Sequence, residues 1–343
     1  MQFRVNEPLS IEEVELPEIG PNQVLMKLSA AGLCLSQIHE LRGESFERPR
    51  GFGHEASGIV EAVGRDVRHV KEGDHALLTW VPRTPIVGRK MTEVTGATVH
   101  GEALHGAYWG WGDRLVVRDE FVIPIRPDDP LDLASVVGCG VMTGAGAVKN
   151  TAGVKAGDSV AIYGVGGVGS SALLMAAALG ASPIIAVDLK PEKLAYALGM
   201  GATHAINASV DDPVQAIWDI TGEGADYAFD TVGARQAAES IVPSVRGGGP
   251  GVSNVGGMAV LVGNPEPEII IKPAWFVGHQ RRLAGSHGAV DPRTELQYFL
   301  DLYREGSFPL DKLVTTRYPL EQVNEAVDAL ARGEILGRAI FEL

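Results

Sequence analysis

Two cysteines and a histidine are the side chains of this sequence best suited to bind a metal ion. Cys34 and Cys139 are the only cysteines in the chain, and His54 stands between them in the segment Gly53-His54-Glu55. Two thiolates and one imidazole form the ligand set expected of a catalytic zinc ion that keeps its fourth position open for water or substrate. Taken singly, a cysteine is most often a small buried hydrophobe, and a histidine beside a glutamate is usually an ordinary pair. Their combination predicts a zinc site.

A glycine-rich motif predicts a second site, for a dinucleotide. Residues 164–169, Gly-Val-Gly-Gly-Val-Gly, fit G-x-G-x-x-G and follow the apolar run at residues 159–163. A helix rich in alanine and leucine is expected over residues 168–179. The first glycine permits a tight turn, the second lets the backbone approach a pyrophosphate, and the third allows close packing of helix on strand. The exposed N–H groups and the dipole of the helix favour bound phosphate.

A carboxylate about 20 residues after the motif strengthens this prediction. Asp188 ends the next apolar strand, where it is expected to accept hydrogen bonds from the adenosine ribose. Its charge would repel the additional phosphate of NADP, so NAD is the expected cofactor. Lys193, on the helix that follows, either softens this preference or is simply solvated. The remaining residues expected near NAD on this part of the chain are Gly167, Val168 and Val262.

The elements that must hold these residues change character near residue 159. The first 135 or so residues contain short β-type runs with frequent turn signals, for example at residues 23–28, 58–63 and 75–80. After residue 159, apolar strands alternate with helices, which is typical of the βαβ units of a parallel sheet. The fold class is therefore predicted to be α/β, with a mainly β domain followed by a doubly wound dinucleotide-binding domain.

Three further segments carry weaker signals. Residues 80–111 are predicted to form a long surface loop. Its aromatic residues either border a substrate cleft or anchor the loop itself. The glycine-rich stretch 246–257 reads as a flexible loop, more typical of a linker than of a ligand contact. From residue 294 onward, two amphipathic helices and a closing strand at residues 339–343 are expected.

Composition excludes several classes of function. The chain has 343 residues, of which 45% are hydrophobic and 21% charged, and its formal net charge is −14. No run approaches the roughly 20 unbroken apolar residues of a membrane helix, so neither a membrane nor, given the charge, a nucleic acid is expected as a partner. The N-terminus lacks the basic start and apolar stretch of a secretory signal, and the cytoplasm is the expected compartment.

These motifs occur in an order that resembles the zinc-dependent medium-chain dehydrogenase/reductase family, whose best-known members are alcohol dehydrogenases. The resemblance spans nearly the whole chain. It rests on Cys34-x-Ser36, on Gly53-His54-Glu55 with the later Gly58, Gly64, Gly73 and Asp74, on Gly138-Cys139-Gly140 with Thr143, and on the nucleotide motif.

The resemblance implies a GroES-like catalytic domain over residues 1–140, a Rossmann domain over residues 141–285, and a return segment over residues 286–343 that completes the catalytic domain. It also implies an active site in the cleft between the domains. Cys34, His54 and Cys139 would bind zinc, with Glu55 either an exchanging ligand or a buried acceptor beside the metal.

Further roles follow from the same resemblance. Ser36 would hydrogen-bond the oxygen of a zinc-bound alkoxide, and His39 would pass the released proton to solvent, although a turn residue and an exposed helix histidine are their ordinary alternatives. Thr143 would lie near the nicotinamide or cap a helix, and Arg338 would contact the pyrophosphate or end a solvated strand. The predicted function is hydride transfer between an alcohol or its carbonyl product and NAD, by a homodimer or homotetramer.

The chain departs from the family pattern in three places. Many relatives carry a second, structural zinc on four cysteines where this chain has residues 82–110, and none of those cysteines is present, so one zinc per subunit is predicted. Gln37 replaces an aspartate that braces the ligand histidine in many relatives, so zinc is either held less firmly or braced otherwise. Leu35 replaces a basic residue that meets the pyrophosphate in some members.

Two other functions stay open at this stage. A zinc-free reductase of the same superfamily would reduce an activated alkene or quinone with NADPH, but Cys34, His54, Cys139 and Asp188 argue against it. A non-catalytic protein that binds NAD is the other alternative, because fold alone does not establish activity.

Overall fold

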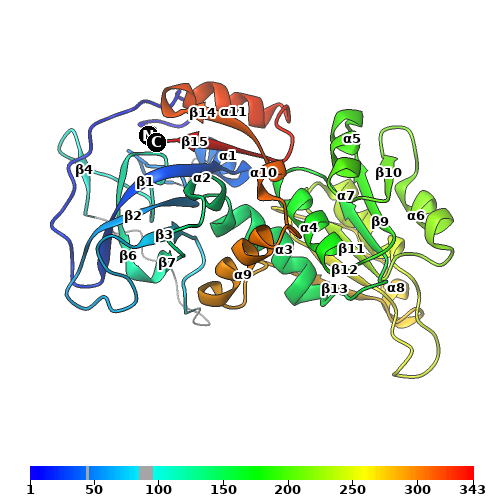
Figure 1. Cartoon of the computed structure of the whole chain (residues 1–343). Coiled ribbons are helices and arrows are strands. Elements are labelled where there is room, and N and C mark those ends of the chain that lie inside the picture. The colour runs from blue at the N-terminus through cyan, green and yellow to red at the C-terminus, as the bar shows by residue number, and fades with distance from the viewer. Residues whose placement is uncertain (44–45, 85–95) are drawn as a thin grey trace. The chain divides into compact units, whose positions relative to one another are not determined.

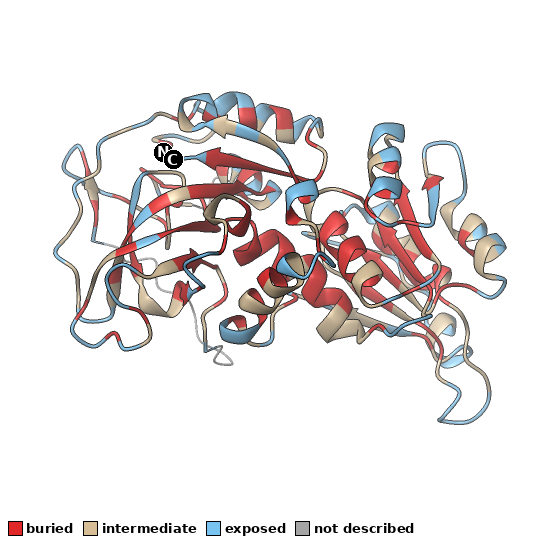
Figure 2. Ribbon diagram, in the orientation of Figure 1, coloured by how far each residue is buried: buried red, intermediate tan, exposed pale blue. Residues whose placement is uncertain are grey.

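The computed structural model describes residues 1–43, 46–84 and 96–343, which form two compact units. The first unit comprises residues 1–140, 291–304 and 314–343, and the second comprises residues 141–290 and 305–313. Each unit has its own sheet and its own buried core (Figures 1 and 2).

The first unit is built on a mainly antiparallel, seven-stranded sheet. Its strand order is β14-β15-β1-β2-β3-β7, with β6 also pairing with β1. Only β14 and β15 run parallel to each other. The strands are β1 (Gln23–Leu33), β2 (Ala56–Val63), β3 (His75–Leu78), β6 (Arg114–Arg118), β7 (Val122–Pro124), β14 (Val314–Pro319) and β15 (Arg338–Glu342). A separate hairpin consists of β4 (Thr98–Val99) and β5 (Glu102–Ala103).

Strand β1 organises this sheet. Its first half alternates between buried and more exposed positions, as expected of a strand with one solvent-exposed face. From Ala30 onward every residue of β1 is buried. The change occurs because β15 joins β1 at Ala30, on a part of the strand that also pairs with β2. The chain therefore leaves β1 at Leu33 inside the protein, and Cys34 follows immediately.

Helices cover the first unit at several points. They are α1 (Leu35–Arg42), α2 (Leu131–Ala134), α9 (Pro292–Arg304) and α11 (Val323–Ala331), with 3-10 turns η1 (Asp119–Phe121) and η4 (Leu320–Gln322). Helices α1 and α11 share a buried cluster with β1 and β15 that includes Leu33, Leu41, Val323 and Phe341.

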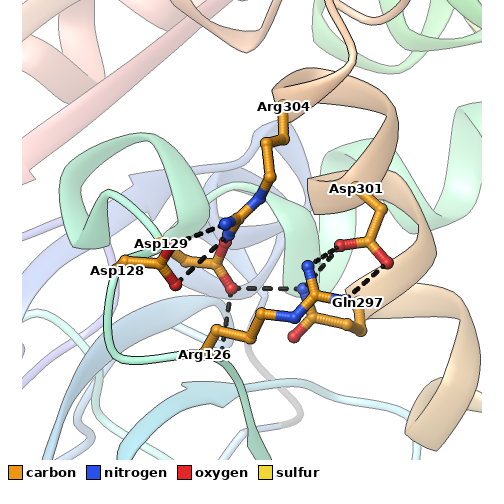
Figure 3. Close-up of polar contacts among 6 residues, drawn as sticks. All are labelled: Arg126, Asp128, Asp129, Gln297, Asp301 and Arg304. Carbon is orange, nitrogen blue, oxygen red and sulfur yellow. Dashed lines mark hydrogen bonds and ion pairs between the residues drawn. The ribbon is translucent and has the colours of Figure 1, made fainter.

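Helix α9 is fastened to the loop after β7 by a polar network (Figure 3). Arg304 pairs with Asp128 and with Asp129, at 2.5 Å in both cases, and the Asp129 side chain is only 2% exposed. Gln297 donates to Asp129 and Asp301, and Asp301 also pairs with Arg126. The network ties the returning part of the chain to residues 126–129.

The second unit contains a six-stranded parallel sheet of order β10-β9-β8-β11-β12-β13. The chain moves outward from β8 through β9 to β10 and then returns to the other side of β8, so the order reverses between β8 and β11. In such sheets the ligand binds beyond the carboxyl ends of the strands at this reversal. The strands are β8 (Val160–Tyr163), β9 (Ile184–Asp188), β10 (His204–Asn207), β11 (Tyr227–Asp230), β12 (Met258–Leu261) and β13 (Arg282–Gly285).

The helices of the second unit follow its strands in the expected alternation. They are α3 (Met142–Gly146), α4 (Gly167–Ala178), α5 (Pro191–Gly199), α6 (Pro213–Thr221), α7 (Arg235–Ser244), α8 (Ala274–Val277) and α10 (Leu310–Leu313). Asp212 caps α6 by accepting from the N–H groups of Val214 and Gln215, and proline opens α5 and α6, as the rules for helix starts predict.

The helical stretch Leu131–Ala152 was not predicted from the sequence. By length and composition it would be able to cross a membrane, but 83% of its most apolar window is buried inside the protein. Burial of this extent is typical of a core helix. Two π-helical segments, η2 (Val137–Val141) and η3 (Ala147–Ala152), lie within the stretch.

Of the two loops interpreted from the sequence, the first differs from its interpretation and the second fits one of its two alternatives. The glycine-rich stretch 246–257 is not a free linker, because Gly248 and Gly256 donate to the carbonyls of His279 and Gln280. In the loop before β6, Trp109 is buried in the core and Trp111 donates from its indole to the Gly32 carbonyl. Within the described residues these aromatic side chains anchor the loop; the prediction for residues 85–95 lies outside the described part of the chain.

Candidate active site

The structure brings the four predicted metal-binding side chains together within the first unit. Cys34 is the N-cap of α1, directly after β1, and His54 and Glu55 directly precede β2. Because β1 and β2 pair antiparallel with Ala31 opposite Ala56, the two segments meet at one end of the sheet. Cys139 arrives from the π-helical segment η2, a distortion that is frequent at functional sites.

The geometry of this cluster suits one small cation. The candidate ligand atoms of Cys34, His54, Glu55 and Cys139 all lie within 4.8 Å of one another, and all four residues are buried. The two sulfurs are 4.0 Å apart, and His54 Nε2 lies 3.1 Å from Cys139 Sγ. Two sulfurs and a nitrogen are the donors that zinc prefers, and a carboxylate completes a set of four. The residues present therefore fit a zinc ion.

The electrostatics of the cluster favour thiolate at Cys34. The pKa of its thiol is held well below the ordinary value of 9.0, first by the hydrogen bond with Cys139 and further by His54 and Arg338, which together outweigh the effect of burial. A thiolate, rather than a thiol, is the form that binds a metal.

Glu55 is fixed on two sides. One carboxylate oxygen accepts from the Gly140 N–H at 3.1 Å, and the other forms an ion pair with Arg338. A larger residue at either neighbouring glycine would displace one of these side chains, since a Cβ at Gly32 would lie 2.5 Å from the Glu55 carboxylate carbon and one at Gly140 would lie 2.9 Å from Arg338 Cζ. Arg338 is thus buried beside the cluster rather than at a solvated strand end, and its expected contact with a pyrophosphate stays a prediction.

The residues predicted to handle the proton lie on α1. The Ser36 hydroxyl donates to Cys34 Sγ at 3.3 Å, so this side chain faces the cluster. His39 is exposed on the same short helix. This arrangement fits an inner hydroxyl and an outer, solvent-accessible base, and the relay itself remains a prediction.

The predicted nucleotide motif has the geometry of a phosphate cradle in the second unit. Gly164 has φ +85°, and a Cβ there would lie 2.3 Å from Val232. A Cβ at Gly169 would lie 1.8 Å from the Gly164 carbonyl oxygen, so the tight turn and the close helix contact both demand glycine. At Gly166, in contrast, nothing lies within 4 Å of an added Cβ. This is the space into which a pyrophosphate would approach the start of α4, so the residues present fit a dinucleotide.

Asp188 lies beside this cradle. Its carboxylate accepts from the N–H groups of Val165, Leu189 and Lys190 at 2.8 to 3.1 Å. These bonds fix the acidic side chain at the carboxyl end of β9, next to the glycine turn. Gly167 and Val168 form the first turn of α4, Lys193 lies in the first turn of α5, and Val262 follows β12 with its N–H bonded to the Asp230 carbonyl. Thr143 lies in α3 and is partly buried.

Two sets of contacts were not anticipated from the sequence. One is the Arg338–Glu55 ion pair. The other joins Gln37, Glu40 and Arg50 next to the His54 loop, the segment of residues 51–54 that ends at His54. The only signal for the second was the replacement noted at Gln37, since nothing in the local pattern marks Glu40 or Arg50 as its partners.

Comparison with known proteins agrees with this fold. Residues 20–127 match the family model for an alcohol dehydrogenase GroES-like domain, and residues 167–305 match the model for a zinc-binding dehydrogenase. The chain belongs to the zinc-binding medium-chain dehydrogenase/reductase family, with a GroES-like domain and a parallel-sheet nucleotide-binding domain.

Individual relatives cover nearly the whole chain. A geraniol dehydrogenase of Castellaniella defragrans is 32% identical over 97% of this chain and 94% of its own length. An NDMA-dependent alcohol dehydrogenase of Amycolatopsis methanolica is 34% identical over 95% of this chain and 94% of its own.

Among solved structures, a zinc-binding-domain alcohol dehydrogenase protein from Burkholderia ambifaria has a TM-score of 0.91 at 32% identity, covering 99% of this chain and 97% of that one. Benzyl alcohol dehydrogenase from Acinetobacter calcoaceticus has a TM-score of 0.87 at 28% identity, covering 96% and 94% respectively. These similarities identify the chain as an oxidoreductase of the alcohol dehydrogenase type.

Proposed function

We propose that this enzyme depends on one zinc ion per subunit and on NAD, and that it interconverts alcohols with their aldehydes or ketones. The observation that carries the proposal is the buried cluster of Cys34, His54, Glu55 and Cys139, whose ligand atoms converge within 4.8 Å. Zinc in such a site acts as a Lewis acid that polarises a substrate oxygen and lowers the pKa of its proton. The prediction of a single ion rests on the chain's having no cysteines beyond Cys34 and Cys139.

The chain's own residues would then divide the work. Cys34, His54 and Cys139 would hold the metal, and Glu55 would either join them or remain with Arg338. Ser36, whose hydroxyl already faces Cys34, would bind the substrate oxygen, and the exposed His39 would exchange the proton with solvent. Gly166 and the first turn of α4 would bind the pyrophosphate, and Asp188 would bind the ribose.

The substrate class is proposed from the relatives. Because a geraniol dehydrogenase and a benzyl alcohol dehydrogenase are both similar over nearly the whole chain, we propose allylic and benzylic primary alcohols as the first substrates to test.

The experiment combines metal analysis with assays. Protein purified without added metal is expected to contain one zinc per chain and to form NADH from NAD in the presence of an alcohol. Removal of zinc by a chelator should abolish this activity, and adding zinc should restore it. A protein free of metal that reduces quinones or enones with NADPH would contradict the proposal, and so would a zinc-loaded protein that is inert with every alcohol, aldehyde and ketone tested.

We also propose a cytoplasmic homodimer or homotetramer assembled through the second unit. Ile270 and Val277 are 60% and 86% exposed there, and exposed apolar side chains that lie together mark candidate interaction surfaces. Residues 268–272 read Glu-Ile-Ile-Ile-Lys, so antiparallel self-pairing about Ile270 would place Glu268 opposite Lys272 of a second copy. Ile270→Asp should lower the mass measured by light scattering, whereas Val210→Asp, also at an exposed site, should not.

A further inference from the structure

A chain of three polar side chains connects the two segments that carry Cys34 and His54. Gln37 lies on α1, one turn after Cys34, and is 3% exposed. Its side-chain oxygen accepts from the backbone N–H of Gly53 at 2.5 Å, and Gly53 is the residue before His54. Gln37 is therefore a direct link between the helix that begins at Cys34 and the loop that ends at His54.

Glu40 decides which way the Gln37 amide points. The Gln37 amide nitrogen donates to Glu40 Oε1 at 2.9 Å, and an ionised carboxylate can only accept. The amide oxygen is consequently turned toward Gly53. A reversed amide would set its NH2 group against the Gly53 N–H and would leave two donors facing each other in a buried place.

Arg50 holds Glu40 in turn. Arg50 Nε lies 3.3 Å from Glu40 Oε2, the Arg50 guanidinium lies 4.8 Å from the centre of the Phe46 ring, and its side chain is only 6% exposed. The Arg50 backbone is itself anchored by reciprocal hydrogen bonds with Gln2. A cavity of about 190 Å³ adjoins these side chains and is lined by Gln37, Glu40, Phe46, Arg50, Gly51, Ala107 and Tyr108. This space leaves room for other rotamers. We therefore infer that the hydrogen bonds, rather than tight packing, hold the side chains of Gln37, Glu40 and Arg50 in these orientations.

The His54 loop needs an external support of this kind. Gly53 has φ +101°, and a Cβ there would lie 2.6 Å from the Trp111 nitrogen, so only glycine fits. Its carbonyl accepts from the backbone N–H of Gly110 at 2.9 Å. Among the described residues, the Gln37 contact is the hydrogen bond that ties Gly53 to the helix bearing Cys34.

We propose that Gln37, Glu40 and Arg50 form a positioning relay that sets the separation of Cys34 and His54 and thereby the affinity and coordination geometry of the bound metal. The inference rests on the proposed zinc site. It assigns Gln37 a role through the backbone of the ligand loop, oriented by a carboxylate one helical turn away. All three are positioning residues, since none of them is placed against the metal or the substrate.

The relay can be tested directly by exchanging the glutamine and the glutamate between positions 37 and 40, which reverses the direction of the hydrogen bond between them. Gln37→Glu would place two carboxylates side by side, and Glu40→Gln would leave one acceptor oxygen for the two donors, the Gln37 amide and Arg50, and turn an NH2 group toward one of them. In the double variant, a glutamate at 37 can accept from Gly53 and from the glutamine at 40, whose oxygen can accept from Arg50. Each single variant is expected to weaken zinc binding by about 10- to 100-fold, the range typical of residues that orient metal ligands, and the double variant is expected to recover most of the loss.

The measurements are the zinc dissociation constant by competition with a chromophoric chelator and the visible spectrum of the cobalt-substituted protein. Asn324→Leu is the matched control, because the Asn324 amide also accepts a backbone N–H, from Leu9 at 2.8 Å, on α11 of the same unit. This control is expected to lower the melting temperature while leaving the zinc affinity and the cobalt spectrum unchanged.

The outcomes separate the relay from the zinc site itself. A wild-type protein that binds neither zinc nor cobalt would overturn the proposed function and the relay with it. Tight wild-type binding with unchanged single variants would overturn the relay alone. So would equal weakening by Asn324→Leu, or a double variant no better than the single ones, since either result would indicate a general loss of stability.

Discussion

Arg338 and Glu55 form an ion pair in which both side chains are almost completely buried, at 4% and 0% exposure, directly beside the Cys34–His54–Cys139 cluster. Transferring two charged groups from water into the protein costs free energy. The attraction between them offsets this desolvation cost only when further hydrogen bonds satisfy both partners. Glu55 has such a bond from the Gly140 N–H and pairs with a terminal nitrogen of Arg338, whereas Arg338 Nε has no hydrogen-bond partner. The pair is therefore completed only in part by the protein itself, which leaves donor capacity for a bound anionic group.

Breaking this pair on one side should destabilise the first unit strongly. Arg338→Met would leave the Glu55 carboxylate buried without its cation and is expected to cost about 3–5 kcal/mol of unfolding free energy. The double variant Arg338→Met with Glu55→Gln removes both charges and should cost clearly less. Urea unfolding of the metal-free proteins in a chelator measures both. A double variant as unstable as the sum of the two single ones would show that the residues are not coupled.

The sequence predicted those parts of the site whose signals are local. The turn between β8 and α4 and the carboxylate at the end of β9 could be placed because strand, glycines and helix follow one another within 30 residues or so. Cys34 and Cys139 could be selected by residue type alone, since the chain has no other cysteines, whereas His54, one of nine histidines, was selected by its place in Gly53-His54-Glu55 and by the family resemblance.

Contacts between distant residues were not predictable in this way. Arg338 meets Glu55 only because β15 pairs with β1, and a single sequence gives no sign of that register. The loop 246–257 was misjudged for the same reason, as its anchors, His279 and Gln280, lie beyond an intervening strand and helix. The helical stretch Leu131–Ala152 was not predicted because its glycines and its charged Asp132 and Lys149 interrupt the apolar pattern, while its burial depends on the whole fold.

Two arginines of the network that fastens α9 should contribute unequally to the free energy of unfolding (Figure 3). Arg304→Met removes the cation that pairs with Asp129, and because the Asp129 side chain is 2% exposed this variant should cost more than Arg126→Met, although the Arg304 side chain is itself 40% exposed. Arg126→Met removes a pair whose side chains are 47% and 33% exposed and should cost about 1 kcal/mol or less. Chemical unfolding at low and high salt tests the difference, because the more exposed Arg126 pair should lose more of its effect when salt is added. Equal costs for the two variants would refute this ranking.

Acid should weaken the second unit through Asp226. Burial raises the pKa of this carboxyl, but hydrogen bonds from Ser159 and the ion pair with Arg246 outweigh burial and leave the pKa below its ordinary value of 3.8. Because the folded protein holds the charged form more firmly than the unfolded chain does, the stabilisation is complete above that value and is lost as the pH falls through it toward the lowered pKa.

Asp226→Asn tests this dependence. The variant is expected to cost about 1–3 kcal/mol at pH 7, where the wild-type hydrogen bonds and ion pair are intact, and the cost should shrink at acidic pH. Unfolding free energies of both proteins across the acidic range give the difference at each pH. A cost that stays constant down to the lowest pH would mean that Asp226 does not titrate as argued.

Replacing two glycines of the nucleotide motif by alanine should have different effects, on stability at one position and on NAD binding at the other. A Cβ at Gly169 would lie 1.8 Å from the Gly164 carbonyl oxygen, so Gly169→Ala must displace α4 from the turn and should lower the melting temperature of the protein. A Cβ at Gly166 meets nothing within 4 Å, so Gly166→Ala should leave the melting temperature nearly unchanged and yet weaken NAD binding, because the methyl group would occupy the space of the pyrophosphate. Thermal unfolding with and without NAD, together with fluorescence titration by NADH, distinguishes the two variants. If Gly166→Ala bound NADH as tightly as the wild type does, the open space at the start of α4 would not be the pyrophosphate site.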